Sequence, residues 1–188
     1  MPRCVVFLRA INVGGRFVKM ADLAMHCTAL GLTDVQTFIA SGNVIFRSRT
    51  RSTSTLAKAI EDGLEPLLGF RSDAFVRTDN ELHAIAQRAM SYQASFRASV
   101  APQGEVNVAM LARPLSPMQV AALAGLRSDL DDFAHLGTEV YWLCKSKQSD
   151  SKFSNAVFER KLGAKATFRR SSMLERLAGQ LRSDHLDP

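Results

Sequence analysis

The chain has 188 residues, 46% of them hydrophobic and 22% charged, a balance typical of a folded protein with a substantial core. Lysine and arginine outnumber aspartate and glutamate by 24 to 18, so the formal net charge is +6, a mild indication of association with anions such as phosphates or nucleic acid. The three cysteines are widely separated and no apolar run approaches the ~20 residues of a membrane helix, which excludes a disulfide framework, a zinc knuckle and a membrane-spanning segment.

The first half of the chain predicts the element order βαββαβ. Apolar or β-branched runs over 5–11, 35–39, 44–46 and 74–76 predict strands, and apolar stripes at helical spacing over 20–30 and 56–67 predict helices. Ala40-Ser41-Gly42-Asn43 separates the second and third strands and predicts a hairpin turn, because Gly and Asn tolerate positive φ.

The same order returns after a connecting segment. Thr78 to Glu81 fits a capping box, so a helix is expected to begin there, and 91–104 is expected to be an irregular connection. Strands are then predicted over 106–111, 133–136, 140–143 and 166–168, with helices beginning after a second capping box at Ser116 and over 153–162, and a final helix over 172–181.

These elements predict an α+β fold of two consecutive ferredoxin-like (βαββαβ) units with antiparallel sheets and a C-terminal helix. The expected divisions are 1–90 for the first unit with its following helix, 91–104 for the connection and 105–188 for the second unit, packed as one globule.

The loop after the first strand, Leu-Arg-Ala-Ile-Asn-Val-Gly-Gly-Arg-Phe-Val-Lys-Met over 8–20, is glycine-rich and basic. It fits neither the Walker A spacing nor Gly-x-Gly-x-x-Gly. Two interpretations stay open, a backbone nest that binds an anion and a structural turn that requires positive φ. Its candidate residues are Arg9, Asn12, Gly14, Gly15, Arg16 and Lys19.

Arg9 falls on the predicted first strand among apolar neighbours. A guanidinium there requires a carboxylate, carbonyl or ligand partner, or a place at the margin of the sheet. Asn12, Ser41 and Asn43 are the polar residues that this topology can bring near Arg9. Because the first and third strands are neighbours, two places stay open for Asn43, beside Asn12 or at the opposite end of the sheet.

An RNA-recognition motif shares this element order but requires exposed aromatics on its first and third strands. Here those strands offer only Phe7 and Phe46, for which a buried position is expected. Arg47, Arg49 and Arg51 form an alternating basic run that either contacts phosphate or forms a solvated edge.

A second basic group lies near the end of the chain. Arg160 near a helix carboxyl end is explained by the helix dipole, whereas Arg169 and Arg170 before the last helix are candidates for an anion contact. Catalytic patterns are sparse, since no histidine pair has metal-ligand spacing and Cys4 has no activating partner.

Three ordered motifs resemble a bacterial protein family. Residues 8–15 follow Leu-Arg-Gly-Ile-Asn-Val-Gly-Gly with Ala10 in place of Gly, and residues 41–46 follow Ser-Gly-Asn-Val-aliphatic-Phe. Asn155, Glu159 and the Arg-Lys-Leu-Gly that follows match a third motif, succeeded by Thr167 and Arg169. The chain is therefore similar, from about residue 3 to residue 181, to domain of unknown function 1697.

The resemblance implies an α+β fold with ferredoxin-like elements and implies no activity. The chain departs from the family at Arg170-Ser171-Ser172, where Asn-Trp-Asn is typical, which argues against a site built from that tryptophan.

We therefore expect a non-catalytic cytoplasmic binding module for a phosphate-bearing small molecule or nucleic acid, with no cofactor, metal or membrane partner. A small-molecule enzyme with a polar pocket between the two halves, and a protein-interaction scaffold, remain alternatives, and the oligomeric state stays open. The expected ligand-binding residues are Arg9, Asn12, Gly14, Gly15, Arg16, Lys19, Ser41, Asn43, Asn155, Glu159, Arg160 and Arg169.

Overall fold

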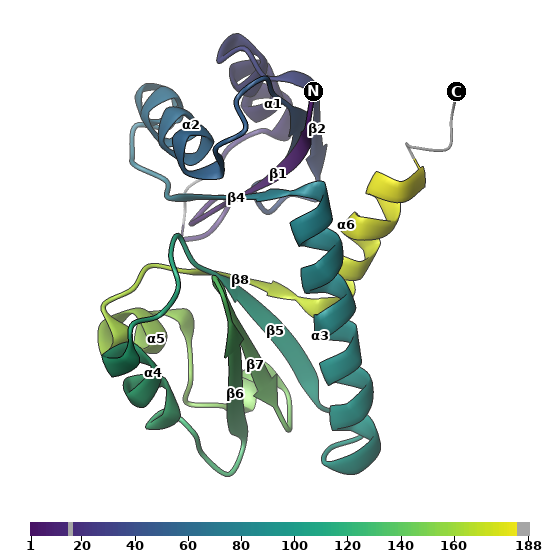
Figure 1. Ribbon diagram of the computed structural model, residues 1–188. Helices are drawn as coiled ribbons and strands as arrows, with labels where there is room; N and C mark the ends of the chain where they lie inside the picture. The colour runs from purple at the N-terminus through teal and green to yellow at the C-terminus, as the bar shows by residue number, and fades with distance from the viewer. Residues whose placement is uncertain (15–16, 184–188) are drawn as a thin grey trace. The chain divides into compact units, whose positions relative to one another are not determined.

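The computed structural model describes residues 1–14 and 17–183 and has an α+β architecture (Figure 1). Within the described residues there are two four-stranded antiparallel sheets and six α-helices. The chain divides into two compact units, Met1–Leu82 and His83–Pro188.

The first unit has the predicted element order. Its sheet has the strand order β2-β3-β1-β4, in which every neighbouring pair is antiparallel. Its elements are β1 (Arg3–Leu8), α1 (Met20–Ala29), β2 (Thr33–Phe38), β3 (Asn43–Arg47), α2 (Thr53–Leu68) and β4 (Ala74–Thr78).

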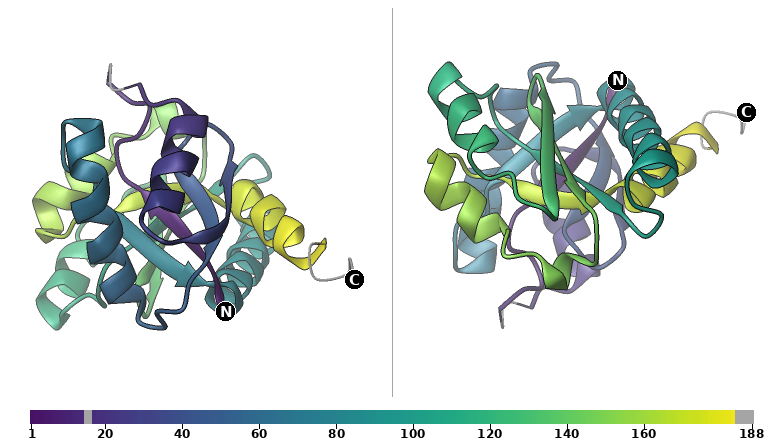
Figure 2. Two further views of the ribbon diagram at one scale, coloured as in Figure 1. Left: turned by 90° about the horizontal axis from the view of Figure 1, so that it is seen from above. Right: turned by 90° about the horizontal axis from the view of Figure 1, so that it is seen from below.

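Helices α1 and α2 lie side by side on one face of this sheet (Figures 1 and 2). Alternate strand residues face these helices, as the two-residue period of a strand requires. Phe46 belongs to this core and Phe7 lies on the opposite side of the strand layer, and both rings are fully buried, so the expected burial of these two aromatics is confirmed. The central members of this core are Cys4, Val6, Leu8, Leu23, Cys27, Val44, Phe46, Leu56, Ile60, Leu64 and Val76.

Strand β1 is shorter than predicted, because it ends at Leu8 rather than at residue 11. Ala10 and Asn12 have φ of 59° and 57°, values outside the extended region, and these turn the chain away from the sheet. Ile11 is still buried against the first core, so its apolar character predicted burial correctly but not a strand.

The second unit repeats this order. Its sheet has the strand order β6-β7-β5-β8, again antiparallel throughout. Its elements are β5 (Glu105–Met110), α4 (Pro117–Ala124), β6 (Asp131–Leu136), β7 (Glu139–Cys144), the short 3-10 helix η1 (Gln148–Asp150), α5 (Asn155–Leu162), β8 (Thr167–Arg170) and α6 (Ser171–Ser183). Figure 2 shows α4 and α5 side by side.

The prediction of an irregular connection over 91–104 is wrong for most of that range. Helix α3 (Asp79–Ser99) begins at the predicted capping box of Thr78 and Glu81 and continues to Ser99, and the two units divide within it. Gln93 occupies a core position on this helix: its Nε2 donates to the carbonyl of Gly104 (2.7 Å), and its Oε1 accepts from the amide of Val106 (2.9 Å). A glutamine at a buried position hides the helical period from a search for apolar residues.

Aromatic side chains fill the core of the second unit. The Trp142 and Phe153 ring centroids lie 4.7 Å apart, and Phe133, Phe158 and Phe168 complete the group. Trp142 and its neighbour Tyr141 are both buried, although their side chains leave β7 on opposite faces. Trp142 points toward α4 and α5, and Tyr141 packs on Tyr92 of α3.

None of the helices in the described part of the chain is both long enough and apolar enough to cross a bilayer.

The buried thiols make the free energy of unfolding depend on pH in the alkaline range. Burial raises the pKa of Cys4 and Cys27 from 9.0 to about 11, with the charges of Glu81 and Asp79 adding to the effect at Cys4. Below pH 9 the stabilisation from the protonated thiols is fully present, and it is lost as the pH rises from 9 towards 11, because only the unfolded chain releases these protons there.

We therefore expect the free energy of unfolding to fall by about 1 kcal/mol per pH unit for each thiol in that interval, as measured by urea unfolding. The variant Cys27→Ala is expected to have a shallower pH slope than the wild type, whatever its stability at pH 8. An unchanged slope would contradict the assignment to this thiol.

Candidate functional site

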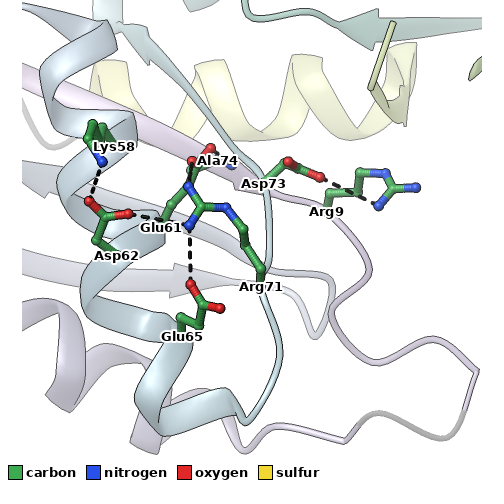
Figure 3. Close-up of polar contacts among 8 residues, drawn as sticks. All are labelled: Arg9, Lys58, Glu61, Asp62, Glu65, Arg71, Asp73 and Ala74. Atoms are coloured by element: carbon green, nitrogen blue, oxygen red, sulfur yellow. Dashed lines mark hydrogen bonds and ion pairs between the residues drawn. The ribbon is translucent and has the colours of Figure 1, made fainter. Parts of the chain in front are cut away.

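The chain leaves β1 at Arg9, which is fastened to the start of β4. The Arg9 amide donates to the carbonyl of Asp73 (2.9 Å), and the Ser72 hydroxyl donates to the carbonyl of Arg9 (2.7 Å). The Arg9 Nη1 lies 3.5 Å from Asp73 Oδ2, with 29% of the Arg9 side chain and 14% of the Asp73 side chain exposed (Figure 3). The partner that sequence required for this guanidinium is thus a carboxylate of the same unit, and Arg9 lies beyond the strand rather than on it.

Asn12 joins the loop after β1 to the hairpin turn between β2 and β3. Its Nδ2 donates to the carbonyl of Ala40 (3.0 Å) and its Oδ1 accepts from the amide of Val18 (2.7 Å). Its left-handed backbone, φ 57°, aims the side chain at both groups. The amide is therefore committed to the fold.

The turn residues Ser41, Gly42 and Asn43 lie at the same end of the sheet. Asn43 stands opposite Phe7 in the β1–β3 register, so it lies near the end of β1 and on the side of Asn12. Its buried Nδ2 donates to the carbonyl of Phe38 (3.1 Å) and to Ser41 Oγ (2.8 Å). Of the two places that the sequence left open for Asn43, the structure has the one on the side of Asn12. The Asn43 side chain there binds the Phe38 carbonyl and Ser41.

Gly42 has φ of 70°, and its carbonyl accepts from the amide of Leu8 (2.8 Å). A Cβ at this position would lie 2.9 Å from the Ile11 side chain. Gly14 has a similar φ of 61° but faces open space. Lys19 is exposed just before α1, and the two other predicted loop residues, Gly15 and Arg16, lie outside the described residues.

A second polar cluster joins α2 to the segment before β4. Glu61 accepts from the amide of Ala74 through Oε1 (2.9 Å) and pairs with Arg71 Nη2 through Oε2 (2.9 Å). Arg71 also contacts Asp62 (3.4 Å) and Glu65 (3.1 Å), and Figure 3 shows its guanidinium among these three carboxylates. This arginine is neutralised within the unit.

Arg49 and Arg51 have a different environment. Strand β3 ends at Arg47, so the next two arginines lie in the loop before α2. Arg47 itself pairs with Asp34 (3.0 Å). Both are exposed, and neither makes a hydrogen bond or an ion pair with the described part of the chain. They line an open hollow of about 650 Å³ together with Met1, Pro2 and Thr78, a set without a carboxylate.

The sequence contained a signal for these two residues, because the alternating run of Arg47, Arg49 and Arg51 was visible. The end of β3 and the pairing of Arg47 distinguish the two loop arginines from a strand edge. Both facts depend on the folded structure.

In the second unit, Asn155 and Glu159 hold α5 against the start of the last strand. Glu159 Oε1 accepts from the amide of Ala166 (3.1 Å), and Asn155 Nδ2 donates weakly to the Ala166 carbonyl (3.4 Å). Glu61 makes the same contact with Ala74 in the first unit. The third motif therefore contains a structural contact that the first unit repeats.

The two predicted arginines of this unit do not share one environment. Arg160 is exposed in the last turn of α5, whereas Arg169 is half-buried on β8. The Arg169 Nη1 donates to Thr167 Oγ1 (2.7 Å) and to the Phe168 carbonyl (2.9 Å), and burial lowers its pKa to about 10. The predicted site residues are thus divided between the two units.

Within the described residues, no three His, Cys, Asp or Glu side chains gather closely enough to hold a metal ion.

A family model described as protein of unknown function (DUF1697) matches residues 1–141. No curated protein matches the chain. A solved structure described as conserved bacterial protein SP0830 from Streptococcus pneumoniae is similar, with a TM-score of 0.74 and 22% sequence identity over 97% of this chain and 99% of that one. At this identity the likeness concerns the fold alone.

The Ile11 side chain occupies the space that a Cβ at Gly42 would need, whereas Gly14 faces open space. Alanine is therefore expected to lower the free energy of unfolding by different amounts at these two glycines, although their φ values are similar. Gly14→Ala is expected to cost about 1 kcal/mol of stability, since only the left-handed backbone opposes the side chain. Gly42→Ala is expected to cost about 3 kcal/mol, because the new methyl group also collides with Ile11. Urea unfolding of both variants measures the difference, and equal losses would contradict the contact.

The carboxylates that accept a backbone amide are expected to be the stabilising ones. Glu61→Ala and Glu159→Ala should each lower the free energy of unfolding by about 2 kcal/mol, because each leaves a strand amide without its acceptor. Glu65→Ala is the matched control: its carboxylate also contacts Arg71 but is 48% exposed, against 18% for Glu61, so a loss below about 1 kcal/mol is expected. A loss at Glu65 as large as that at Glu61 would contradict this assignment.

Proposed function

We propose that this chain, which belongs to the DUF1697 family of proteins of unknown function, is a non-catalytic binding module for phosphate groups. The phosphate groups would be carried by nucleic acid or by a small molecule. The observation that supports this proposal is the pair of exposed arginines, Arg49 and Arg51, on a hollow without a carboxylate.

The proposal depends on a comparison among the arginines of the first unit. Arg9, Arg47 and Arg71 each lie within 3.5 Å of a carboxylate, so their charge is largely used within the fold. The guanidinium groups of Arg49 and Arg51 are exposed to solvent and make no ion pair with the described residues. Guanidinium groups match phosphate oxygens with two parallel hydrogen bonds, which favours arginine over lysine at such a site.

The segment that follows these arginines adds hydroxyl groups. Ser52 caps α2, its Oγ accepting from the amide of Thr55 (3.2 Å), and the first turn of α2 contains no acidic residue. A phosphate beside Arg49 and Arg51 would therefore meet positive charge and the favourable end of the helix dipole, and no acidic residue in the first turn of α2 would repel it.

Arg9, Asn12, Ser41 and Asn43 have a supporting role in this proposal, because they shape the loops of the first unit. Arg169 is held by Thr167 and by backbone, so Arg160 and Lys19 are the other exposed cations of the predicted set among the described residues. These are weaker candidates, since neither lines the hollow of Arg49 and Arg51.

We also propose that both units are ferredoxin-like. The support is the strand order β2-β3-β1-β4, its counterpart β6-β7-β5-β8, and the equivalent contacts of Glu61 and Glu159. A cytoplasmic location is proposed because Cys4, Cys27 and Cys144 are free thiols, which suit a reducing compartment.

The test is a titration of fluorescently labelled single-stranded DNA, double-stranded DNA and RNA with the full chain at about 50 and about 200 mM salt. We expect salt-dependent binding that the double variant Arg49→Ala/Arg51→Ala weakens about tenfold or more at low salt, with a salt slope reduced by about 2. Competition by inorganic tripolyphosphate distinguishes the sources, because a small-molecule site binds it in preference to the oligonucleotides.

The control is Lys147→Ala/Lys161→Ala, which removes the same charge from exposed positions of the second unit. This variant is expected to keep most of the affinity. Absence of binding to every probe at low salt, or an equal loss in the two double variants, would reject the proposed site.

A further inference from the structure

The second unit contains a hollow of about 600 Å³ that is separate in sequence from Arg49 and Arg51. It lies between the end of α3 and the ends of β6 and β7 that are remote from their hairpin. Its volume falls within the range of small-molecule sites, which is about 300 to about 1,000 Å³. All of its lining residues belong to the second unit.

One wall of the hollow is apolar. Tyr92 and Phe96 are four residues apart, so they lie on one side of the last turns of α3, and Val100 follows directly after the helix with its amide bonded to the Phe96 carbonyl (2.9 Å). Leu143 of β7 also lines the hollow. Val100 is 54% exposed and adds apolar surface to this wall.

This wall is held in place from behind. The Tyr92 ring packs edge-on against the buried ring of Tyr141, with centroids 5.0 Å apart. Phe96 packs against Gly104, where a Cβ would lie 2.5 Å from the ring, so only glycine leaves room for it. The aromatic wall is therefore preorganised.

The floor of the hollow is a buried carboxylate whose oxygens are already bound. Asp131 accepts from Trp142 Nε1 (2.8 Å), from Ser128 Oγ (2.8 Å) and from Ser151 Oγ (2.8 Å to each oxygen). These donors occupy its lone pairs, so Asp131 offers little to a ligand cation. It links the hollow to Trp142, the one tryptophan of the chain.

Of the two cations that line the hollow, Arg127 forms an ion pair within the described residues and Lys145 does not. Arg127 Nε pairs with Asp132 Oδ1 (2.6 Å), and Arg127 Nη2 donates to the Phe133 carbonyl (3.2 Å). The Lys145 amide donates to the Leu130 carbonyl (2.8 Å), which holds its backbone at the hollow. In the described part of the chain, the Lys145 ammonium makes no hydrogen bond or ion pair.

We propose that this hollow binds a small organic carboxylate with an apolar body. The carboxylate pairs with Lys145, and the apolar body lies against Tyr92, Phe96 and Leu143. An uncharged apolar molecule would leave the ammonium unpaired, and a short polar anion would leave the aromatic wall exposed to water. The inference is independent of the phosphate-binding proposal, because the two hollows share no residue.

The test uses phenylacetate as the probe, with phenylacetamide and acetate for comparison, titrated into the full chain by calorimetry and by the fluorescence of Trp142. Phenylacetate is expected to bind about tenfold more tightly than phenylacetamide, which lacks the charge, and more tightly than acetate, which lacks the ring. Fluorescence is expected to change on binding, because Asp131 joins the hollow to the indole.

The matched variants are Lys145→Gln and Lys147→Gln, two nearby lysines of which only the first lines the hollow. Lys145→Gln is expected to weaken phenylacetate about tenfold and to abolish its advantage over the amide, whereas Lys147→Gln and Arg49→Ala/Arg51→Ala leave it unchanged. Ser95→Phe, which fills the hollow from an exposed helical position, is expected to abolish binding. No binding of phenylacetate, equal binding of acid and amide, or equal effects of the two lysine variants would overturn the proposal.

Discussion

A glutamate carboxylate that accepts the first amide of the last strand is the contact on which much of the first unit depends. Glu61 holds Ala74 at the start of β4. The preceding residue, Asp73, then accepts the amide of Arg9 and pairs with its guanidinium, while Ser72 binds the carbonyl of the same residue. The path of the chain as it leaves β1 is therefore set by a contact on α2. Glu159 and Ala166 repeat the contact in the second unit.

The distribution of carboxylates also decides which cations remain available. A guanidinium close to a carboxylate contributes little field to solution, and it would have to break that pair to bind a ligand. By this criterion the charges of Arg9 and Arg71 stabilise the fold. The charges of Arg49, Arg51 and Lys145, which make no ion pair with the described residues, are available to bind a ligand. The family motif indicated Arg9 as a ligand-binding residue, whereas the pattern of ion pairs favours Arg49, Arg51 and Lys145. The difference matters because a family motif can preserve a loop geometry as readily as a binding site.

Most of the secondary structure could be predicted, because strands and helices follow local periodicity and capping. The extension of α3 to Ser99 could not, since Gln93 takes a core position through hydrogen bonds to residues 104 and 106. The early end of β1 was missed for a related reason. Ile11 is buried as an apolar residue should be, but the positive φ of Ala10 and Asn12 is stabilised by contacts with distant segments.

Local sequence patterns were sufficient to predict the α+β class, the order of elements in both halves, the hairpin at Ser41 to Asn43 and the burial of Phe7 and Phe46. These depend on side-chain period and turn chemistry, which act over a few residues. The folded structure was needed to show that Asn12 and Asn43 bind backbone and that Arg9 pairs with Asp73. It was also needed to show that Arg49, Arg51 and Lys145 make no ion pair with the described residues. The reason is physical: whether a polar side chain is satisfied depends on groups that the fold brings from far along the chain, and residue type alone does not contain that information.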